Sequence, residues 1–127
     1  MDWNHDFRDD GILELKCNGK FSNSAFLKIF LQVTSDPMWR PGMNVLADFR
    51  DVNFDEVQFD DIIESIDVHV QFNEFIGESK IAAIHLSDNG LRLGKIYEVI
   101  SRLSVKSKIN TFKNYEDAVE WVQLHEK

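Results

Sequence analysis

The sequence of 127 residues contains one cysteine, Cys17. A single thiol cannot form an intramolecular disulfide, so the chain is not a small secreted scaffold held together by disulfides, and a reducing, cytoplasmic compartment is expected. The acidic N-terminal residues lack the apolar run of a signal peptide. No stretch approaches the ~18 uninterrupted apolar residues of a membrane span, so we expect no stable insertion into a membrane.

Sequence patterns of catalytic and metal sites are also missing. The cysteine and the histidines lie too far apart along the chain for a zinc-binding pattern. Residues 89–94 contain two glycines, but neither a Walker Lys-Ser pair nor the three-glycine pattern of a dinucleotide site, and we expect these glycines to allow close helix packing. We therefore expect no metal, no cofactor and no enzymatic activity, with His69 and His85 as hydrogen-bonded structural histidines.

Positive charge is scarce, since 22 acidic residues face 14 basic ones and the net charge is −8. This balance disfavours nucleic acid as a partner, because binding phosphates requires a local excess of Lys and Arg. The imbalance is local. Residues 55–78 hold acidic side chains and no Lys or Arg, whereas residues 80–108 are basic overall. The sequence thus predicts an acidic element followed by a basic one.

Hydrophobic periodicity indicates strands that alternate with helices. We predict a single α/β domain, residues 1–127, with a mixed, mostly parallel five-stranded sheet and about four helices in the order β-β-α-β-α-β-α-β-α. A first hairpin is expected to be antiparallel, with Asn18-Gly19 as a turn dipeptide. The expected strands lie near residues 5–8, 12–17, 45–49, 80–86 and 108–112, and the helices follow Ser22, Glu56, Ser87 and Tyr115.

The acidic segment is predicted to be one long helix over residues 56–75. Its acidic side chains form a stripe, and an apolar face made by Phe59, Ile62, Ile63, Ile66 and Val70 is expected to face the core. A second apolar sector flanks the acidic stripe and is wider than one contact with a sheet requires. We predict that this sector is a partner or dimer surface, formed by Val68, Phe72, Phe75 and Ile76.

Four motifs follow one another along the chain in a recognisable order: residues 11–19, 45–54, 89–97 and 111–122. Together they resemble the SpoIIAA-like proteins of the STAS superfamily, which are related in fold to CRAL-TRIO lipid-binding domains. The resemblance implies a small bacterial cytoplasmic domain, often a homodimer, from a family whose molecular function is largely unassigned.

The chain departs from the anti-anti-sigma factors of that superfamily at one functional position. At the start of the helix after the third strand, those proteins carry a sequence similar to Asp-Ser-Ser-Gly, in which a serine is phosphorylated. Here no hydroxyl residue lies between Asp51 and Asp61, so a phosphoryl acceptor is missing. Asp55 or Glu56 could supply a permanent negative charge at the helix start, although carboxylates are common there for helix stability alone.

Polar residues cluster where two buried strands are expected to end. Asp48, Arg50 and Asp51 leave one strand, and Ser87, Asp88 and Asn89 leave the next. Open α/β sheets tend to bind ligands at the carboxyl ends of their strands, so these six residues are a candidate ligand site. The alternative interpretation is that Arg50 forms a local ion pair with Asp48 or Asp51 and that the Ser-Asp-Asn run caps a helix.

Two functional hypotheses follow. The first is a non-catalytic regulatory module of STAS type that acts by protein–protein association, as a homodimer or with another protein. The second is a carrier or sensor of a small apolar or lipid-like ligand held between the helices and the sheet. Ten phenylalanines and the CRAL-TRIO relationship suggest the second, although aromatic side chains also simply fill cores.

Overall fold

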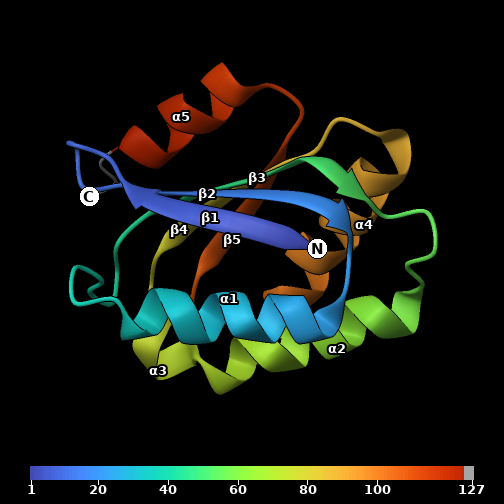
Figure 1. Cartoon of the computed structure of the whole chain (residues 1–127), viewed down its shortest axis with the longest axis horizontal. Helices are drawn as coiled ribbons and strands as arrows, with labels where there is room; N and C mark the ends of the chain where they lie inside the picture. The colour runs from blue at the N-terminus through green and yellow to red at the C-terminus, as the bar shows by residue number, and fades with distance from the viewer. Residues whose placement is uncertain (125–127) are drawn as a thin grey trace.

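The computed structural model describes residues 1–124 and contains a five-stranded sheet with helices on both faces (Figure 1). The strands lie in the sheet in the order in which they occur in the chain. β1 is antiparallel to β2, and all other neighbours are parallel. The elements are β1 (Asp2–Phe7), β2 (Leu13–Lys20), α1 (Asn23–Ser35), β3 (Val45–Asn53), α2 (Phe59–Gln71), α3 (Asn73–Ile76), β4 (Lys80–Ile84), α4 (Asp88–Ser101), β5 (Lys108–Phe112) and α5 (Tyr115–Gln123).

Helices α1, α2 and α4 cover one face of the sheet because three successive crossovers move in the same direction across it. A β-α-β crossover is almost always right-handed, so helices that follow β2, β3 and β4 fall on the same side. Their apolar side chains, including Phe30 and Leu93, form the main core with strand residues such as Leu15. α5 covers the opposite face, where Ala118 packs near Leu46 in a smaller core.

The predicted fold class and order of elements are confirmed, but the predicted helix over residues 56–75 is interrupted. Residues 54–58 precede α2 as a loop, and the backbone N–H of Gln58 donates to the Asp61 carboxylate at the helix start. At the other end, Phe72 leaves helical geometry (φ −104°, ψ 10°) and separates α2 from the short α3. No helix in the described part of the chain has the length and apolar character needed to cross a bilayer.

The prediction of a turn at Asn18-Gly19 is wrong. β2 continues through both residues to Lys20 and pairs with β3 to its end. Gly19 has a positive φ of 91°, a conformation that glycine adopts without steric cost. The register between β2 and β3 shifts between Lys16 and Asn18, so β3 carries one extra residue beyond Asp48. A bulge of this kind changes the direction of nearby side chains, here those of the predicted polar group.

Candidate functional site

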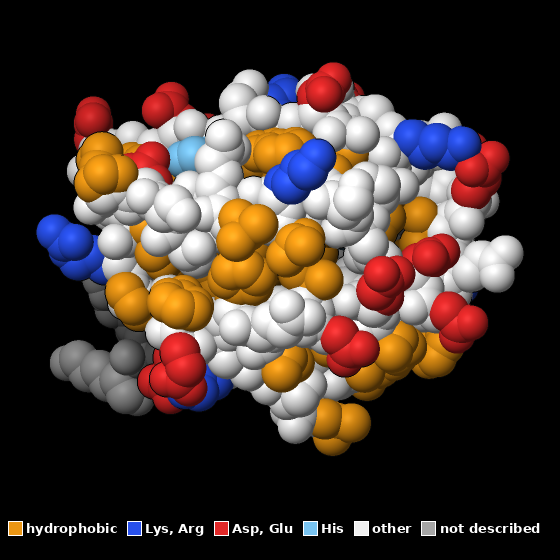
Figure 2. Space-filling model, turned by 60° about the horizontal axis from the view of Figure 1, so that its bottom comes forward, with side chains coloured by type: hydrophobic (Ala, Val, Ile, Leu, Met, Phe, Trp, Pro, Cys, Tyr) orange, Lys and Arg blue, Asp and Glu red, His pale blue; other side chains and the backbone are white. Residues whose placement is uncertain are grey.

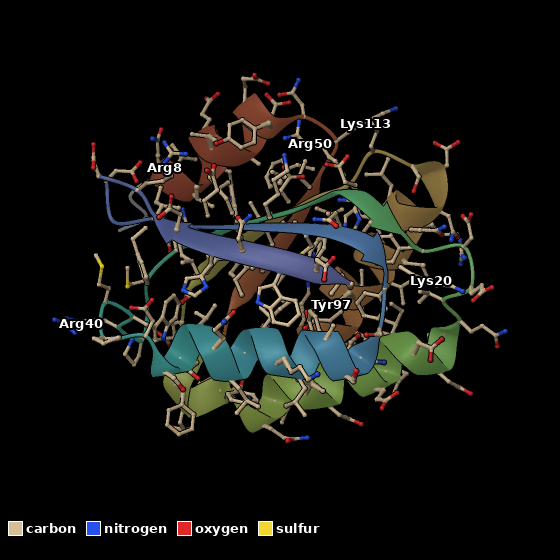
Figure 3. All side chains as sticks on the ribbon, viewed as in Figure 1. Arg8, Lys20, Arg40, Arg50, Tyr97 and Lys113 are labelled. Carbon is tan, nitrogen blue, oxygen red and sulfur yellow. The ribbon has the colours of Figure 1, made fainter. Side chains whose placement is uncertain are left out.

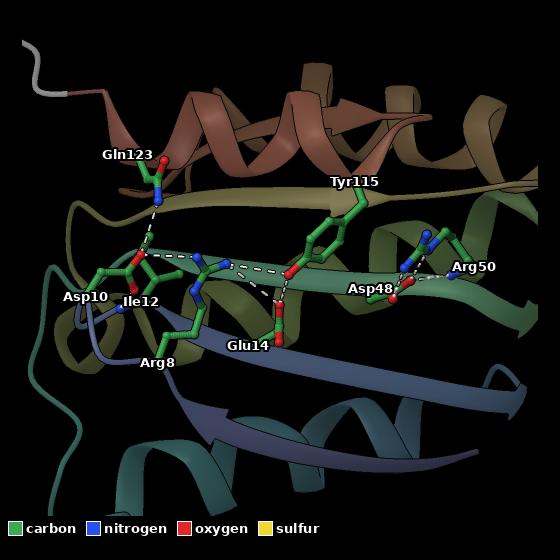
Figure 4. Close-up of polar contacts among 8 residues, drawn as sticks. All are labelled: Arg8, Asp10, Ile12, Glu14, Asp48, Arg50, Tyr115 and Gln123. Atoms are coloured by element: carbon green, nitrogen blue, oxygen red, sulfur yellow. Dashed lines mark hydrogen bonds and ion pairs between the residues drawn. The ribbon is translucent and has the colours of Figure 1, made fainter.

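Asp48 and Arg50, which the sequence placed in a candidate ligand site, form a bidentate ion pair on the α5 side of β3 (Figure 4). The Arg50 Nε and Nη2 atoms donate to the two carboxylate oxygens at 2.9 and 2.8 Å, and the Arg50 backbone N–H adds a third hydrogen bond. The Arg50 guanidinium also lies over the Tyr115 ring, 5.4 Å from its centroid. Two of the five guanidinium N–H groups are thus used within the chain.

The electrostatics of this pair favour a structural role. Burial of the Asp48 side chain acts to raise its pKa, but hydrogen bonds from the Arg50 guanidinium and backbone outweigh burial and hold the pKa of Asp48 below its usual value. Asp51 is exposed and lies 4.0 Å from the Lys16 ammonium. The alternative interpretation of an ion pair between Arg50 and Asp48 is therefore confirmed.

The second half of the predicted site, at the start of α4, caps that helix. The Ser87 hydroxyl accepts a hydrogen bond from the Gly90 backbone N–H, and Asp88 is exposed in the first turn. Asn89 donates to the Phe54 carbonyl and accepts from Arg92. Among the hydrogen bonds and ion pairs of residues 1–124 described here, none joins this group to Asp48, Arg50 or Asp51. The six residues therefore form two separate hydrogen-bonded groups in the described part of the chain, and a ligand that binds them stays a prediction.

The predicted partner sector is wrong for three of its four residues. Val68, Phe72 and Ile76 are buried, and only Phe75, 58% exposed, lies at the surface. α1 packs against α2, and the Phe72 ring is stacked on Phe30 at a centroid distance of 5.2 Å. The buried face of α2 is rotated relative to the prediction, because Ser65 and His69 point inward while Phe59 and Val70 are exposed.

An apolar cavity of about 120 Å³ lies between the sheet and the three helices α1, α2 and α4. Sequence reasoning proposed a ligand in this layer but did not identify the residues that line it. Five of the phenylalanines contribute to its walls, together with aliphatic side chains of β2, β3, β4 and β5. The polar side chains in the lining include Ser65, His69, His85 and Tyr97. Figure 3 places Tyr97 in this layer, close to α1 in the view.

The two histidines in the cavity wall each carry a buried ring nitrogen without a hydrogen-bond partner among the described residues. His69 Nδ1 lies 2.8 Å from the Tyr97 hydroxyl, and His69 Nε2 is unpaired. His85 Nδ1 is also unpaired. The expectation of hydrogen-bonded histidines is thus confirmed for His69 Nδ1 and is wrong for His85 Nδ1. Burial lowers the pKa of each ring to about 4, so both are neutral near pH 7.

Close packing of α4 positions His85. A β-carbon at Gly94 would lie 2.8 Å from His85 Nε2, and one at Gly90 would lie 3.1 Å from His85 Nδ1. The faces of the imidazole are occupied by aromatic rings, since Phe49 stacks on it at 5.3 Å and Phe54 lies tilted at 5.2 Å. The expectation that these glycines allow close helix packing is thereby confirmed. The two glycines four residues apart were the sequence signal that could have located the cavity wall.

The sheet is mixed and its strands lie in chain order, with α1, α2 and α4 on one face and α5 on the other. A solved structure with this architecture is that of an uncharacterised protein of the DUF3478 family with a SpoIIAA-like fold, from Shewanella loihica PV-4. It superposes with a TM-score of 0.62 over 95% of this chain and 92% of that chain, at 13% sequence identity. No family profile matches the chain, and no curated protein matches it in sequence. The resemblance predicted from the sequence is thus confirmed at the level of the fold.

Proposed function

We propose that the protein binds a small, mainly apolar ligand that carries one hydroxyl group, in the cavity between the sheet and α1, α2 and α4. The observation that carries this proposal is an apolar cavity whose wall includes His69, a residue with a buried ring nitrogen, Nε2, that has no partner among the described residues. A buried polar atom without a partner costs free energy, and a ligand that supplies the missing hydrogen bond recovers that cost. The proposed role is that of a carrier or sensor.

The size of the cavity sets the size of the ligand. Its volume of about 120 Å³ is close to the ~150 Å³ of an engineered apolar cavity that stays dry and binds benzene. A single aromatic ring or a short branched alkyl chain therefore fits without rearrangement. A long-chain lipid does not fit unless the helices move away from the sheet. Phe21, Phe26 and Phe49 are only partly buried, so this part of the wall reaches solvent.

The chemistry of His69 favours a hydroxyl over other polar groups. The ring is neutral and carries one proton, and its Nδ1 shares a hydrogen bond with the Tyr97 hydroxyl. Either tautomer is compatible with that bond, so Nε2 is a donor in one case and an acceptor in the other. A hydroxyl group both donates and accepts, and it suits both tautomers. A charged group is disfavoured because the other atoms of the wall are almost entirely apolar.

The test is a titration of the purified protein with toluene and phenol, followed by amide and methyl chemical shifts. We expect saturable shifts at cavity residues, with phenol bound more tightly, and we expect His69→Phe to abolish the preference for phenol. Ala47→Leu fills the cavity and should abolish binding of both compounds, whereas Leu31→Phe adds bulk on the exposed side of α1 and should leave binding unchanged. Absence of saturable binding to the unaltered protein would refute the proposal.

Protein–protein association, the regulatory role predicted from the sequence, is the second candidate function. It is supported by large apolar side chains that remain exposed on α2 and α4, rather than by the predicted sector, most of which is buried. Figure 2 shows the helical face of the molecule, where hydrophobic side chains interrupt the polar surface and acidic side chains lie beside them. Sedimentation velocity over a range of protein concentrations tests whether the chain associates at all.

A further inference from the structure

We infer that the ligand of the cavity is a phenol with a short aminoalkyl chain, whose ammonium group lies outside the apolar cavity in a second, polar hollow beside it. This inference rests on the proposed function and specifies the chemical class of its ligand. The polar hollow has a volume of about 160 Å³. Six polar side chains contribute to its wall: Lys20, Ser22, Asn23, Asn53, Glu56 and Asp61.

The cavity and the polar hollow meet at one aromatic side chain. Phe21 belongs to the walls of both spaces. Its ring is only partly buried, and it stacks on Phe54 at a centroid distance of 5.5 Å. A rotation of the Phe21 side chain would join the two spaces at this point. One ligand could then place an apolar part in the cavity and a polar part in the hollow.

Helix α2 contributes to the walls of both spaces with one face. Asp61 lines the polar hollow, and Ser65 and His69 line the cavity. The three residues are spaced by four positions, so their side chains lie on the same side of the helix. A rise of about 1.5 Å per residue separates Asp61 from His69 by about 12 Å. Two hydrogen bonds of about 3 Å each leave roughly 6 Å between them, which one aromatic ring with a two-carbon chain spans.

The charges in the wall of the polar hollow favour a positively charged group. Glu56 forms an ion pair with Lys20. Asp61 takes part in none of the ion pairs formed within residues 1–124. One carboxylate of the hollow is therefore without a cationic partner in the described part of the chain, and an ammonium group would supply one.

Asn23, at the start of α1, adds a hydrogen-bond acceptor to the same wall. The two helices begin at the same end of the helical layer (Figure 1), and Asn23 Nδ2 donates to the Asp61 carbonyl and to the Glu64 carboxylate, both at 3.0 Å. Both partners are acceptors, which fixes the orientation of the amide. Its Oδ1 atom is buried and has no hydrogen-bond partner among the described residues. An ammonium group carries three donors and suits this oxygen, whereas a carboxylate head group would bring only acceptors.

The experiment is an NMR titration of the full chain with three phenols that differ in one group. Tyramine carries an aminoethyl chain, 4-ethylphenol carries an ethyl chain, and 3-(4-hydroxyphenyl)propionate carries a chain that ends in a carboxylate. We expect tyramine to bind about tenfold more tightly than 4-ethylphenol, because its ammonium group adds charge-assisted hydrogen bonds. The carboxylate compound should bind most weakly. Tyramine should shift the side-chain amide signals of Asn23 and the methyl signals of the cavity in the same titration.

Asp61→Asn separates charge from hydrogen bonding at the hollow. Asparagine can still accept the hydrogen bond that Asp61 takes from the Gln58 backbone N–H, so the start of α2 is preserved. This variant should bind tyramine about as weakly as 4-ethylphenol, and its affinity for 4-ethylphenol should be unchanged. The matched control is Asp67→Asn, which removes the same charge from an exposed position of α2 and should leave the preference for tyramine intact.

The outcomes separate this inference from the proposed function. Tyramine bound no more tightly than 4-ethylphenol would overturn the inference, and so would a preference for tyramine that survives Asp61→Asn. Tighter binding of the carboxylate compound would also overturn it, because the head group would then be an anion beside Lys20. An equal loss of preference in Asp67→Asn would reduce the effect to overall charge and overturn the site. In all these cases binding of 4-ethylphenol would still support the cavity ligand, and only a failure of all three phenols to bind would refute both.

Discussion

Gly94 of α4 and His85 at the end of β4 lie so close together that a β-carbon on residue 94 would approach the imidazole Nε2 to 2.8 Å. The same β-carbon would lie 3.0 Å from the Thr111 methyl group. The imidazole has little room to move away, because Phe49 stacks on one of its faces. This contact therefore sets both the distance of α4 from the sheet and the position of one wall of the cavity.

Gly94→Ala should destabilise the fold even though alanine is the better helix former. The gain in helix propensity is roughly 1 kcal/mol, and overpacking a rigid site costs about 1–3 kcal/mol, so we expect a net loss of about 1 kcal/mol. Urea unfolding measures the change. Arg92→Ala, an exposed position on the same helix, is the control and should change stability by no more than about 0.5 kcal/mol. An increase in stability on Gly94→Ala would mean that α4 is free to shift outward.

Phe72→Ala and Phe75→Ala should differ sharply, although both residues were assigned to one surface from the sequence. Phe72 is buried against Phe30, so its truncation should cost about 3–5 kcal/mol. Phe75 is mostly exposed, and its loss should cost no more than about 0.5 kcal/mol. Thermal or chemical unfolding of the two variants gives the comparison. Equal effects would contradict the packing of α1 on α2.

Stability should decrease as the pH falls from 7 to 5, because of the two buried histidines. Both have a pKa of about 4 in the folded chain, below the usual 6.5, so the unfolded chain binds protons that the folded chain does not. Below pH 6.5 each histidine therefore lowers the free energy of unfolding by up to about 1.4 kcal/mol per pH unit. Urea unfolding at several pH values should show this slope, and His85→Gln should reduce it by about half. If His85→Gln left the pH dependence of the unfolding free energy unchanged, His85 would have to be exposed to solvent in the folded chain.

Arg50→Ala should destabilise the fold by leaving the Asp48 carboxylate buried without its guanidinium partner. The expected cost is about 1–3 kcal/mol, reduced by the partial exposure of Arg50. The pKa of Asp48 should rise, because burial then acts with less opposition. NMR titration of the carboxyl group measures that shift. The double variant Asp48→Asn/Arg50→Ala should recover part of the stability, and equal losses in the single and double variants would argue against a coupled pair.

The arrangement of the sheet could be predicted because it depends on local patterns. Short apolar runs such as residues 45–47 and 81–84 are typical of buried parallel strands, and the Ser22 and Ser87 caps mark the helices that follow. The right-handedness of β-α-β crossovers then predicts which face of the sheet each helix covers. These signals lie within a few residues of one another, so one sequence is sufficient to read them.

The orientation of α2 could not be predicted, because two polar residues face inward. The predicted apolar face leaves Ser65 outside the core and His69 only beside it, but the Ser65 hydroxyl donates to the Ile62 carbonyl and His69 contacts Tyr97. Each contact offsets part of the cost of burial and rotates the helix. The cavity could not be predicted for a related reason, because its volume depends on how side chains from eight separate helices and strands meet. Sequence spacing does not determine such long-range packing.

The strands lie in the sheet in the same order as in the chain, and this order affects how the sheet can form during synthesis. Each strand pairs with the strand made just before it, so no strand must be inserted between two that are already paired. The sheet can therefore grow from the N-terminal hairpin while later strands are still on the ribosome. At every stage the growing edge of the sheet is unpaired, in addition to the outer edge of β1, and the growing edge moves from β2 to β5 as the chain lengthens. A truncated chain that ends before β5 would leave β4 open, and such fragments should be the ones that aggregate.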